Sequence, residues 1–200
     1  MRTGVFGGSF DPVHNGHVQL VQAFVRELSL DSALIVPAFV SPFKLDRVPA
    51  LPEQRLEMCS LAFRDIPCAE ICDIEIKREG ASYTCLTLVE LAKKYGTQKL
   101  FLITGADSFM TIHKWKEPGI IFEHAVICAV PREDDDMQAL EGQAELLHAL
   151  GAETRLLNAS VMTVSSTEIR RRVSAGESIS GLVPEAVERY IAENGLYRTK

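Results

Sequence analysis

The sequence contains few cysteines, a single tryptophan, no long apolar run and no excess of positive charge. Its five cysteines are an odd number scattered among apolar neighbours, and none forms a C-x-x-C motif, so we interpret them as free thiols. No apolar stretch approaches the roughly 20 residues that a membrane helix needs, and the first residues resemble a strand and not a signal peptide. We therefore expect no membrane partner and a cytoplasmic location.

The net charge of -6 gives the chain no overall attraction for nucleic acid or for an anionic surface. A ligand that carries phosphate must therefore be held by local groups. The sequence also lacks repeats, low-complexity tracts and long linkers, and its hydrophobic content of 46% suffices for a sizeable core. We expect one domain over residues 1–200 and leave a homodimer open.

Apolar runs rich in β-branched residues predict buried strands, and segments of helical periodicity lie between them. The predicted strands are residues 4–6, 33–36, 71–76, 100–103 and 125–128, and the helical segments are 18–28, 56–63 and 88–95. This alternation predicts an α/β fold, a doubly wound parallel sheet with helices on both faces. Ligands are then expected at the carboxyl ends of the strands.

Proline and glycine mark where several helices begin and end. Pro52 and Pro184 suit the first turn of a helix, and Gly96 and Gly195 follow helical patterns as C-terminal stops do. An acidic run at 133–136 is typical of a helix start, whose positive dipole end favours carboxylates.

Residues 7–17 read GGSFDPVHNGH and lie directly between an apolar stretch and a helical pattern. A glycine-rich turn lets the backbone approach a ligand, and the N–H groups at the start of the following helix attract anions. His14 and His17 are three residues apart, so a helix that begins near Asn15 would turn both imidazoles toward the same ligand. Zinc is disfavoured because no third ligand follows at metal spacing. The segment is neither a G-x-G-x-x-G fingerprint nor a P-loop.

This segment resembles the G-[TS]-F-D-P-x-H-x-G-H signature of nucleotidyltransferases that move an adenylyl group from ATP to a phosphate acceptor. The second signature of that superfamily, Ser-Ser-Thr-x-Ile-Arg, is matched by residues 165–170, SSTEIR. Over nearly its whole length the chain resembles the bacterial nicotinate-nucleotide adenylyltransferases. The resemblance implies a Rossmann-like nucleotidyltransferase fold, and ATP and nicotinate mononucleotide as substrates. The products would be nicotinate adenine dinucleotide (deamido-NAD) and pyrophosphate, made in NAD biosynthesis by in-line attack without a covalent intermediate.

The resemblance also implies which residues act, with Mg²⁺ carried by the ATP phosphates and no metal ligand from the protein. The implied catalytic residues are His14, His17, Lys44 and Arg170. The implied ATP-binding residues are Gly7, Gly8, Ser9, Phe10, Gly16, Gly105, Asp107, Arg132, Ser165, Ser166, Thr167 and Ile169. The implied acceptor-binding residues are Ser82, Tyr83, Thr84, Trp115 and Lys116.

The second motif can be interpreted from its residues as well. Ser165 and Glu168 have the spacing of a reciprocal capping box at a helix start. A cap alone leaves Ser166, Thr167 and Arg170 unexplained, and together they would place hydroxyls, backbone N–H groups and a guanidinium around a phosphate.

The chain departs from the family pattern at three places. Phe43 stands where the family has histidine, Ala81 replaces a proline, and Lys116 and Glu117 follow Trp115 where the family often has tyrosine and lysine. Trp115 either stacks on the pyridine ring or anchors the core. The alternatives are therefore nicotinamide mononucleotide or phosphopantetheine as acceptor, or a nucleotide-binding module without catalysis.

Overall fold

The computed structural model describes residues 1–40, 50–96, 99–131 and 136–198. Lys44, an expected catalytic residue, and Arg132, an expected ATP-binding residue, lie outside these described ranges together with Phe43.

Six strands within the described ranges form one sheet in the order β3-β2-β1-β4-β5-β6, and every neighbouring pair is parallel. The strands are β1 (Thr3–Gly8), β2 (Ser32–Pro37), β3 (Ala69–Ile71), β4 (Leu100–Thr104), β5 (Ala125–Ala129) and β6 (Glu153–Leu156). The chain winds outward from β1 in one direction and from β4 in the other, which confirms the doubly wound parallel sheet expected from the sequence.

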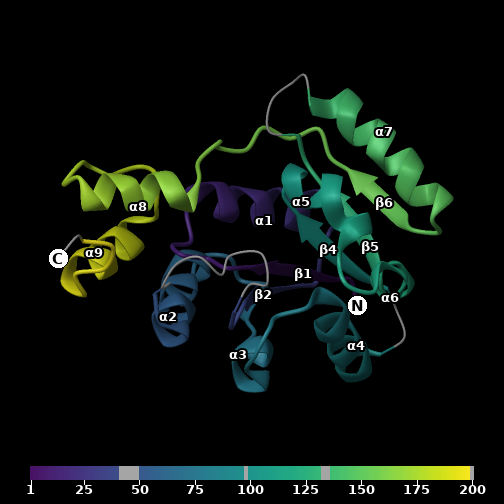
Figure 1. Cartoon of the computed structure of the whole chain (residues 1–200), viewed down its shortest axis with the longest axis horizontal. Helices are drawn as coiled ribbons and strands as arrows, with labels where there is room; N and C mark the ends of the chain where they lie inside the picture. The colour runs from purple at the N-terminus through teal and green to yellow at the C-terminus, as the bar shows by residue number, and fades with distance from the viewer. Residues whose placement is uncertain (41–49, 97–98, 132–135, 199–200) are drawn as a thin grey trace.

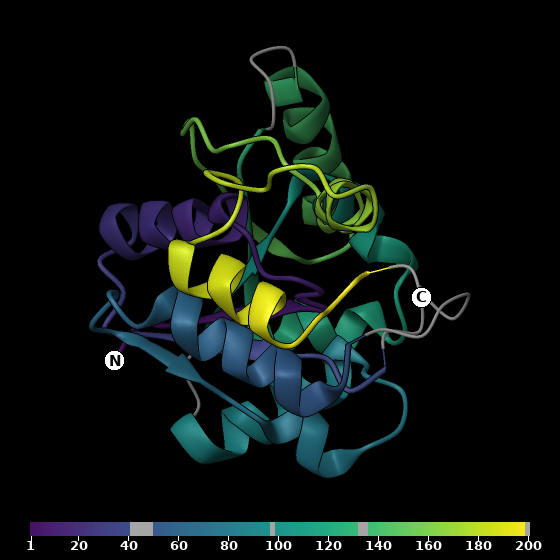
Figure 2. The same cartoon turned by 90° about the vertical axis from the view of Figure 1, so that its left-hand side faces the viewer.

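Helices cover both faces of this sheet (Figure 1). They are α1 (Asn15–Glu27), α2 (Pro52–Phe63), α3 (Ile74–Arg78), α4 (Thr84–Tyr95), α5 (Ala106–Thr111), the 3-10 turn η1 (Ile112–Lys114), α6 (Pro118–His124), α7 (Asp136–Ala149), α8 (Ser166–Ser174) and α9 (Glu185–Glu193). Figure 2 shows α9 lying along α2, and the two helices are in contact.

The pleat of the strands divides the core into two layers. Phe6 and Ile35 face the layer built with α1, α2, α8 and α9, whereas their neighbours Val5 and Leu34 face the layer built with α4, α5, α6 and α7. Adjacent residues of one strand point to opposite faces, so apolar runs without alternation are what a sheet covered on both sides requires.

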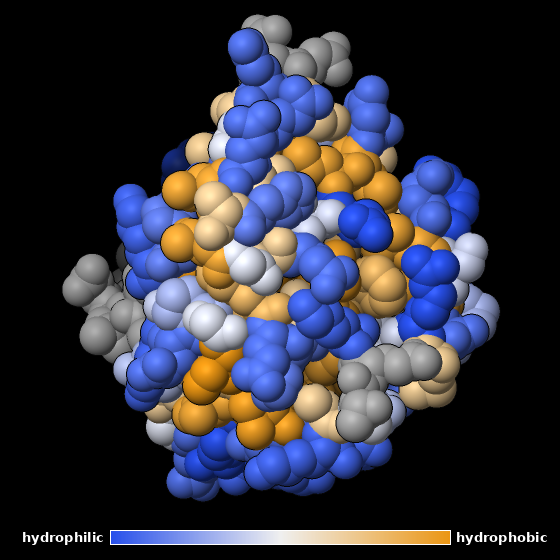
Figure 3. Space-filling model, turned by 90° about the vertical axis from the view of Figure 1, so that its right-hand side faces the viewer, coloured by the Kyte–Doolittle hydropathy of each residue, from blue (hydrophilic) through white to orange (hydrophobic). Residues whose placement is uncertain are grey.

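The outer face that carries α6 and α7 is mixed in character (Figure 3). Leu146 and Leu150, at the end of α7, are 44% and 53% exposed. In this view hydrophobic side chains reach the surface in small groups separated by hydrophilic ones.

The expected strand at 71–76 is wrong beyond its first residue. Ile71 pairs with β2, but Ile74 already begins α3. The N–H of Lys77 donates to the carbonyl of Asp73, and the two side chains form an ion pair of 3.0 Å. Ile71 and Ile74 have the three-residue spacing of a helix, whereas Ile74 and Ile76 have the two-residue spacing of a strand, and the local contacts of Asp73 and Lys77 favour the helix.

Edge strand β6 (Glu153–Leu156) was not expected from the sequence. Only Thr154 of its four residues is buried, so no apolar run marked it.

The predicted helix ends mostly agree with the structure. Pro52 is the first residue of α2, and Gly96 and Gly195 follow α4 and α9 with φ of 93° and 59°. Pro184 lies one residue before α9, at its N-cap. Helix α7 begins at Asp136, the last residue of the acidic run. No helix in the described ranges is long and apolar enough to cross a membrane.

Candidate active site

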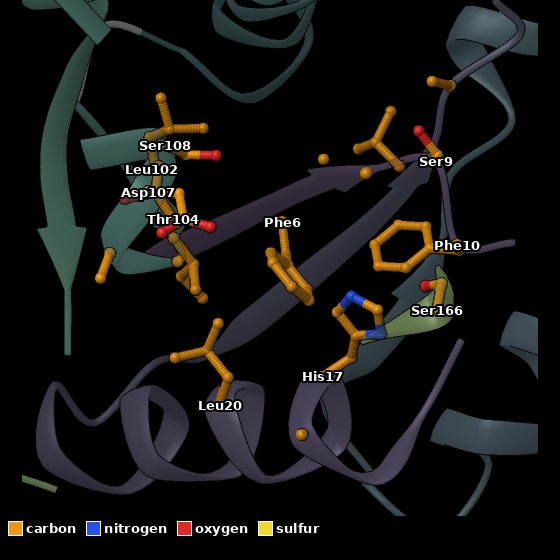
Figure 4. Close-up of a pocket in the computed structure, with 18 of the residues that line it drawn as sticks. Phe6, Ser9, Phe10, His17, Leu20, Leu102, Thr104, Asp107, Ser108 and Ser166 are labelled. Carbon is orange, nitrogen blue, oxygen red and sulfur yellow. The ribbon is translucent and has the colours of Figure 1, made fainter. Parts of the chain in front are cut away.

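A cleft of about 870 Å³ opens where the winding of the sheet reverses, between β1 and β4. Its walls come from the carboxyl ends of those strands and from the starts of α1, α5 and α8, and Ser82 and Thr84 at the start of α4 also line it. In Figure 4, His17, Phe10 and Ser166 lie together at one end, and Thr104, Asp107 and Ser108 at the other. This is where ligands bind in doubly wound folds.

Most of the expected site residues line this cleft. They are Gly7, Gly8, Ser9, Phe10, His14, Gly16, His17, Ser82, Thr84, Gly105, Asp107, Trp115, Ser165, Ser166 and Thr167. Tyr83, Lys116, Ile169 and Arg170 are not among the lining residues. The two motifs, about 150 positions apart in the sequence, therefore share one cavity.

His14 and His17 begin helix α1 as a reciprocal pair. The N–H of His14 donates to Nδ1 of His17 at 3.1 Å, and the N–H of His17 donates to Nδ1 of His14 at 3.4 Å. The rings stack with centroids 3.5 Å apart and planes 22° from parallel. Because each Nδ1 accepts a hydrogen bond, the proton of each neutral ring resides on Nε2, and that N–H is a donor for an anion.

Aromatic rings restrict where the His17 imidazole can lie. Phe10 meets it edge-on at 5.1 Å between centroids, and Phe6 lies 5.7 Å away. Phe10 itself packs edge-on against Phe6 and has a positive φ of 46°. A Cβ at Gly8 would lie 2.9 Å from the Phe10 ring, so this arrangement requires glycine there.

The start of α1 differs from the expected cradle of open backbone N–H groups. The amides of His14 and His17 donate to imidazole Nδ1 atoms, and the Asn15 N–H donates to the carbonyl of Leu182 at 2.9 Å. Three amides at this helix start are thus bonded within the protein. Imidazole N–H groups therefore replace these amides as the donors that the start of α1 offers to the cleft.

The start of α8 is fastened to the turn between β1 and α1. The Ser166 hydroxyl donates to the carbonyl of Pro12 at 2.9 Å, and Arg170 Nη1 donates to the carbonyl of Asp11 at 2.6 Å. The amides of Ser166 and Thr167 are the first of α8, so they have no acceptor within the helix and lie at its positive end.

The expected capping box at α8 is only half formed. Ser165 Oγ accepts from the Glu168 N–H at 3.2 Å, as predicted. The Glu168 carboxylate does not return to the cap but binds Arg171 and Arg172 at 2.8–2.9 Å. Two guanidinium groups are stronger donors to a carboxylate than one backbone amide.

Ile169, expected to bind ATP, and Arg170, expected to be catalytic, are two residues of the second motif that do not line the cleft. Ile169 is fully buried in the core, so its side chain anchors α8 and does not line the cavity. The Arg170 guanidinium joins Asp11 to the Thr167 hydroxyl, 2.9 Å from Nη2.

Comparison with known proteins agrees with this geometry. The cytidylyltransferase-like family matches residues 5–172. A protein of Lachnoclostridium phytofermentans named "Probable nicotinate-nucleotide adenylyltransferase" is 37% identical over 98% of both chains, and one of the same name from Roseiflexus sp. is 40% identical over 98% of this chain and 97% of the relative. The chain belongs to the nicotinate-nucleotide adenylyltransferase family.

The fold of this family member also matches a solved structure. A nicotinic acid mononucleotide adenylyltransferase of Plasmodium falciparum complexed with NaAD superposes with a TM-score of 0.80, covering 98% of this chain and 97% of that one. At 16% identity this likeness supports the fold alone.

Arg55 supports the turn between β1 and α1 in this adenylyltransferase family member, and sequence reasoning missed it. Arg55 is 2% exposed, and its guanidinium donates to the carbonyls of Ser9, Ala38, Phe39 and Ala50 at 2.5–3.1 Å. Burial lowers the pKa of Arg55, while the nearby charge of Asp11 opposes that shift. In sequence Arg55 looks like a solvated residue of α2, so no local signal marks it.

Glu75 is a second residue that sequence reasoning missed. It lines the cleft, is 6% exposed, and accepts a hydrogen bond from the Thr87 hydroxyl. Burial raises the pKa of Glu75, and hydrogen bonds from Thr87 and Ser82 oppose the shift. Ser82 Oγ also accepts the Phe39 N–H at 2.9 Å, so Glu75 helps to hold the loop before α4 against the end of β2.

The aromatic residues that were expected to bind the acceptor, Tyr83 and Trp115, lie near η1 and the start of α4. Trp115 follows η1, is half-buried and lines the cleft. The ammonium of Lys116 lies 4.1 Å from the ring centroid of Tyr83, a cation–π contact beside α4.

Within the described ranges, no three His, Cys, Asp or Glu side chains gather in a way that could hold a metal ion. The polar groups along the cleft are instead mainly imidazoles, hydroxyls and helix-start amides. Such donors suit phosphate oxygens.

Proposed function

We propose that this chain transfers AMP from ATP to nicotinate mononucleotide, giving nicotinate adenine dinucleotide and pyrophosphate. One observation carries the proposal: the histidine pair and the start of α8 converge on a single cleft at the point where the sheet winding reverses. Sequence identity of 37% over almost the whole length to a relative of that name supports it.

The chemistry needs no nucleophile from the protein. The acceptor phosphate is already anionic, and one of its oxygens attacks the α-phosphorus while the bond to pyrophosphate breaks and its electron pair leaves with the pyrophosphate. The protein must position two anionic substrates and stabilise the charge that develops on the phosphoryl oxygens. The Nε2–H groups of His14 and His17 serve that purpose, and Lys44 and Arg170 are proposed to add positive charge.

ATP is proposed to lie between the two motifs. The Gly7, Gly8 and Gly16 backbones allow close approach, Ser9 and Phe10 border both substrates, and the start of α8 binds phosphate oxygens. Gly105 and Asp107 at the end of β4 are proposed to contact the adenosine ribose, and Arg132 the nucleotide.

The acceptor is proposed to lie at the α4 and η1 end. Trp115 is half-buried and lines the cleft, so one side of its indole can stack on the pyridine ring. Ser82 and Thr84 line the same end of the cleft, and Tyr83 lies between them as the N-cap of α4. The Lys116 ammonium adds a positive charge beside Tyr83, which favours an acidic pyridine substituent over a neutral amide.

Mg²⁺ fits the proposed site as an ion carried by the ATP phosphates, because the imidazoles, hydroxyls and helix starts that line the cleft suit phosphate oxygens. When bound, it neutralises phosphate charge and makes the pyrophosphate a better leaving group. Three further expectations stay predictions: one domain over the whole chain, a homodimer, and a cytoplasmic location where ATP is available.

The test is an assay with ATP and Mg²⁺ in which nicotinate mononucleotide, nicotinamide mononucleotide and phosphopantetheine are offered separately and dinucleotide and pyrophosphate are quantified. We expect the highest kcat/KM with nicotinate mononucleotide. Equal turnover of acid and amide would contradict the acceptor assignment. ATP binding without product from any acceptor would instead indicate a non-catalytic module.

The Trp115→Ala variant tests the acceptor end separately, with Trp115→Phe as its conservative partner. Loss of stacking, worth about 1 kcal/mol beyond burial, should raise KM for the acceptor several-fold in the alanine variant and leave KM for ATP unchanged. The phenylalanine variant should recover part of the loss.

A further inference from the structure

Asp11 lies in the turn between β1 and α1, residues 9–14, and is 1% exposed. Its carboxylate oxygen Oδ1 accepts hydrogen bonds from the Tyr197 hydroxyl at 2.7 Å and from the Ala50 N–H at 3.2 Å. Its backbone carbonyl accepts from Arg170 at 2.6 Å. Four segments of the chain therefore meet at this residue: the turn itself, the start of α2, helix α8 and the segment after α9.

The segment after α9 is held in a defined path up to this contact. The Leu196 N–H donates to the carbonyl of Ile191 at 3.0 Å, and Leu196 and Tyr197 pack against the core beneath α1 and α2. Tyr197 has a φ of +62°, a conformation that costs a tyrosine about 1 kcal/mol or more. Packing and the bond to Asp11 offset that cost.

The same cluster holds a buried cation. Arg55 feels the charge of Asp11 and lies close enough to Tyr197 to be coupled to it electrostatically. Its guanidinium donates to the carbonyl of Ser9, the first residue of that turn, and to the carbonyl of Ala50. The turn that leads to His14 is thus held at two points. Arg55 binds the Ser9 carbonyl, and Tyr197 binds the Asp11 carboxylate.

We infer that Tyr197 is a positioning residue for adenylyl transfer: its hydroxyl, bound to Asp11, holds the β1–α1 turn in the geometry that presents His14 and His17 to the reacting phosphates. The inference rests on the proposed function. It assigns a role at the active site to a side chain 180 positions after His17 that does not line the cleft.

Tyr197 can affect the reaction because Asp11, which it binds, is close in the chain to the imidazole donors of His14 and His17. His14 is three residues after Asp11, and the bonds of Ser166 to Pro12 and of Arg170 to Asp11 fasten the same turn to α8. Loss of one charge-assisted hydrogen bond lets the turn shift, and small misplacements of reacting groups reduce rate more than they reduce binding. We therefore expect the effect in kcat and not in KM.

The test compares Tyr197→Phe with Tyr190→Phe. Tyr190 lies on α9 and packs against the same core, and within the described ranges its hydroxyl makes no hydrogen bond. At a temperature where both variants are folded, we expect Tyr197→Phe to lower kcat about tenfold with KM for both substrates unchanged, and Tyr190→Phe to behave as wild type. A Tyr197→Phe variant that loses only thermal stability, or changes nothing, would overturn the inference.

A double-mutant cycle with Asp11→Asn tests the route of the effect. If Tyr197 acts through Asp11, Tyr197→Phe should lower kcat much less in the Asp11→Asn background than in wild type. Independent effects that multiply would overturn the inference while leaving the proposed function intact. A wild-type protein without adenylyl transfer would instead overturn the proposed function, and the inference with it.

Discussion

The imidazoles of His14 and His17 stack 3.5 Å apart, and each accepts the backbone N–H of the other through Nδ1. One pair of side chains thus does two things. Nδ1 of His17 accepts the His14 amide at the start of α1, and Nδ1 of His14 is a second acceptor for the His17 amide, which also donates to the His14 carbonyl at 2.9 Å. The Nε2 atoms keep their protons and supply donors in the cleft.

The two nitrogens can be separated by mutation. In a His17→Asn variant the amide oxygen can replace Nδ1 as acceptor, but nothing replaces the Nε2 donor. We expect the unfolding temperature to stay close to that of wild type while kcat falls about 10²–10³-fold, as when one transition-state donor is removed.

The matched control for this variant is His124→Asn at the end of α6, outside the cleft lining. It should leave kcat unchanged. Near-normal turnover of His17→Asn would remove His17 from the mechanism.

We expect replacement of Arg55 to lower the free energy of unfolding strongly. An Arg55→Met variant keeps an apolar stem but leaves the buried Ala38 carbonyl and the part-buried carbonyls of Ser9, Phe39 and Ala50 without this donor, so the free energy of unfolding should fall by more than about 2 kcal/mol. Urea unfolding followed by the fluorescence of Trp115, the single tryptophan, measures this change. Arg64→Met, at an exposed arginine 3.7 Å from Asp65, should change stability by less than about 0.5 kcal/mol. Equal effects of the two variants would contradict the bracing role.

We expect substitution by alanine to have opposite effects on stability at two helical glycines, Gly16 and Gly142. A Cβ at Gly16 would lie 2.6 Å from the carbonyl oxygen of Met162, so Gly16→Ala must push the segment before α8 away from α1. It should lower both the unfolding temperature and kcat. Nothing lies within 4 Å of a Cβ at Gly142 in α7, so Gly142→Ala should stabilise by up to about 1 kcal/mol with normal activity. A destabilised Gly142→Ala, or an unaffected Gly16→Ala, would contradict this packing.

Glu168 predicts a change of stability with pH. Hydrogen bonds from Arg171 and Arg172 lower the pKa of this carboxyl to about 2 from its ordinary 4.5. A lowered folded-state pKa stabilises the protein above pH 4.5, and the contribution is lost as pH falls toward 2. The unfolding temperature of wild type should therefore exceed that of Glu168→Gln above pH 4.5, and the difference should shrink on acidification.

Salt provides the control for that measurement. Glu168 and Arg171 have side chains 39% and 52% exposed, so added salt should weaken the difference at neutral pH. A difference that persists at pH 2 would show that the carboxylate charge is not its source.

Local patterns were sufficient for much of this protein. The strands around Val5, Leu34, Leu102 and Ile127 could be predicted because a sheet covered on both faces needs uninterrupted apolar runs. The convergence of His14 and His17 could be predicted because three-residue spacing at a helix start places both rings on one side, and the rings do stack there.

The predictions that failed concerned segments whose conformation or hydrogen bonds depend on more than the local apolar pattern. Ile74 could continue a strand or begin a helix, and the contacts between Asp73 and Lys77 decided for α3. Edge strand β6 carries almost no apolar signal. The open amides expected at α1 are bonded to the histidines and to Leu182, a partner far away in the sequence.

The sequence by itself determined the alternation of strands and helices, the two motifs and the kind of anion they suit, because periodicity, steric freedom at glycine and side-chain chemistry act over a few neighbouring residues. Only the tertiary structure decided that Arg55, Glu75 and Tyr197 support the site. Each owes its role to burial against segments distant in the chain, and that burial exists only once the sheet has brought those segments together.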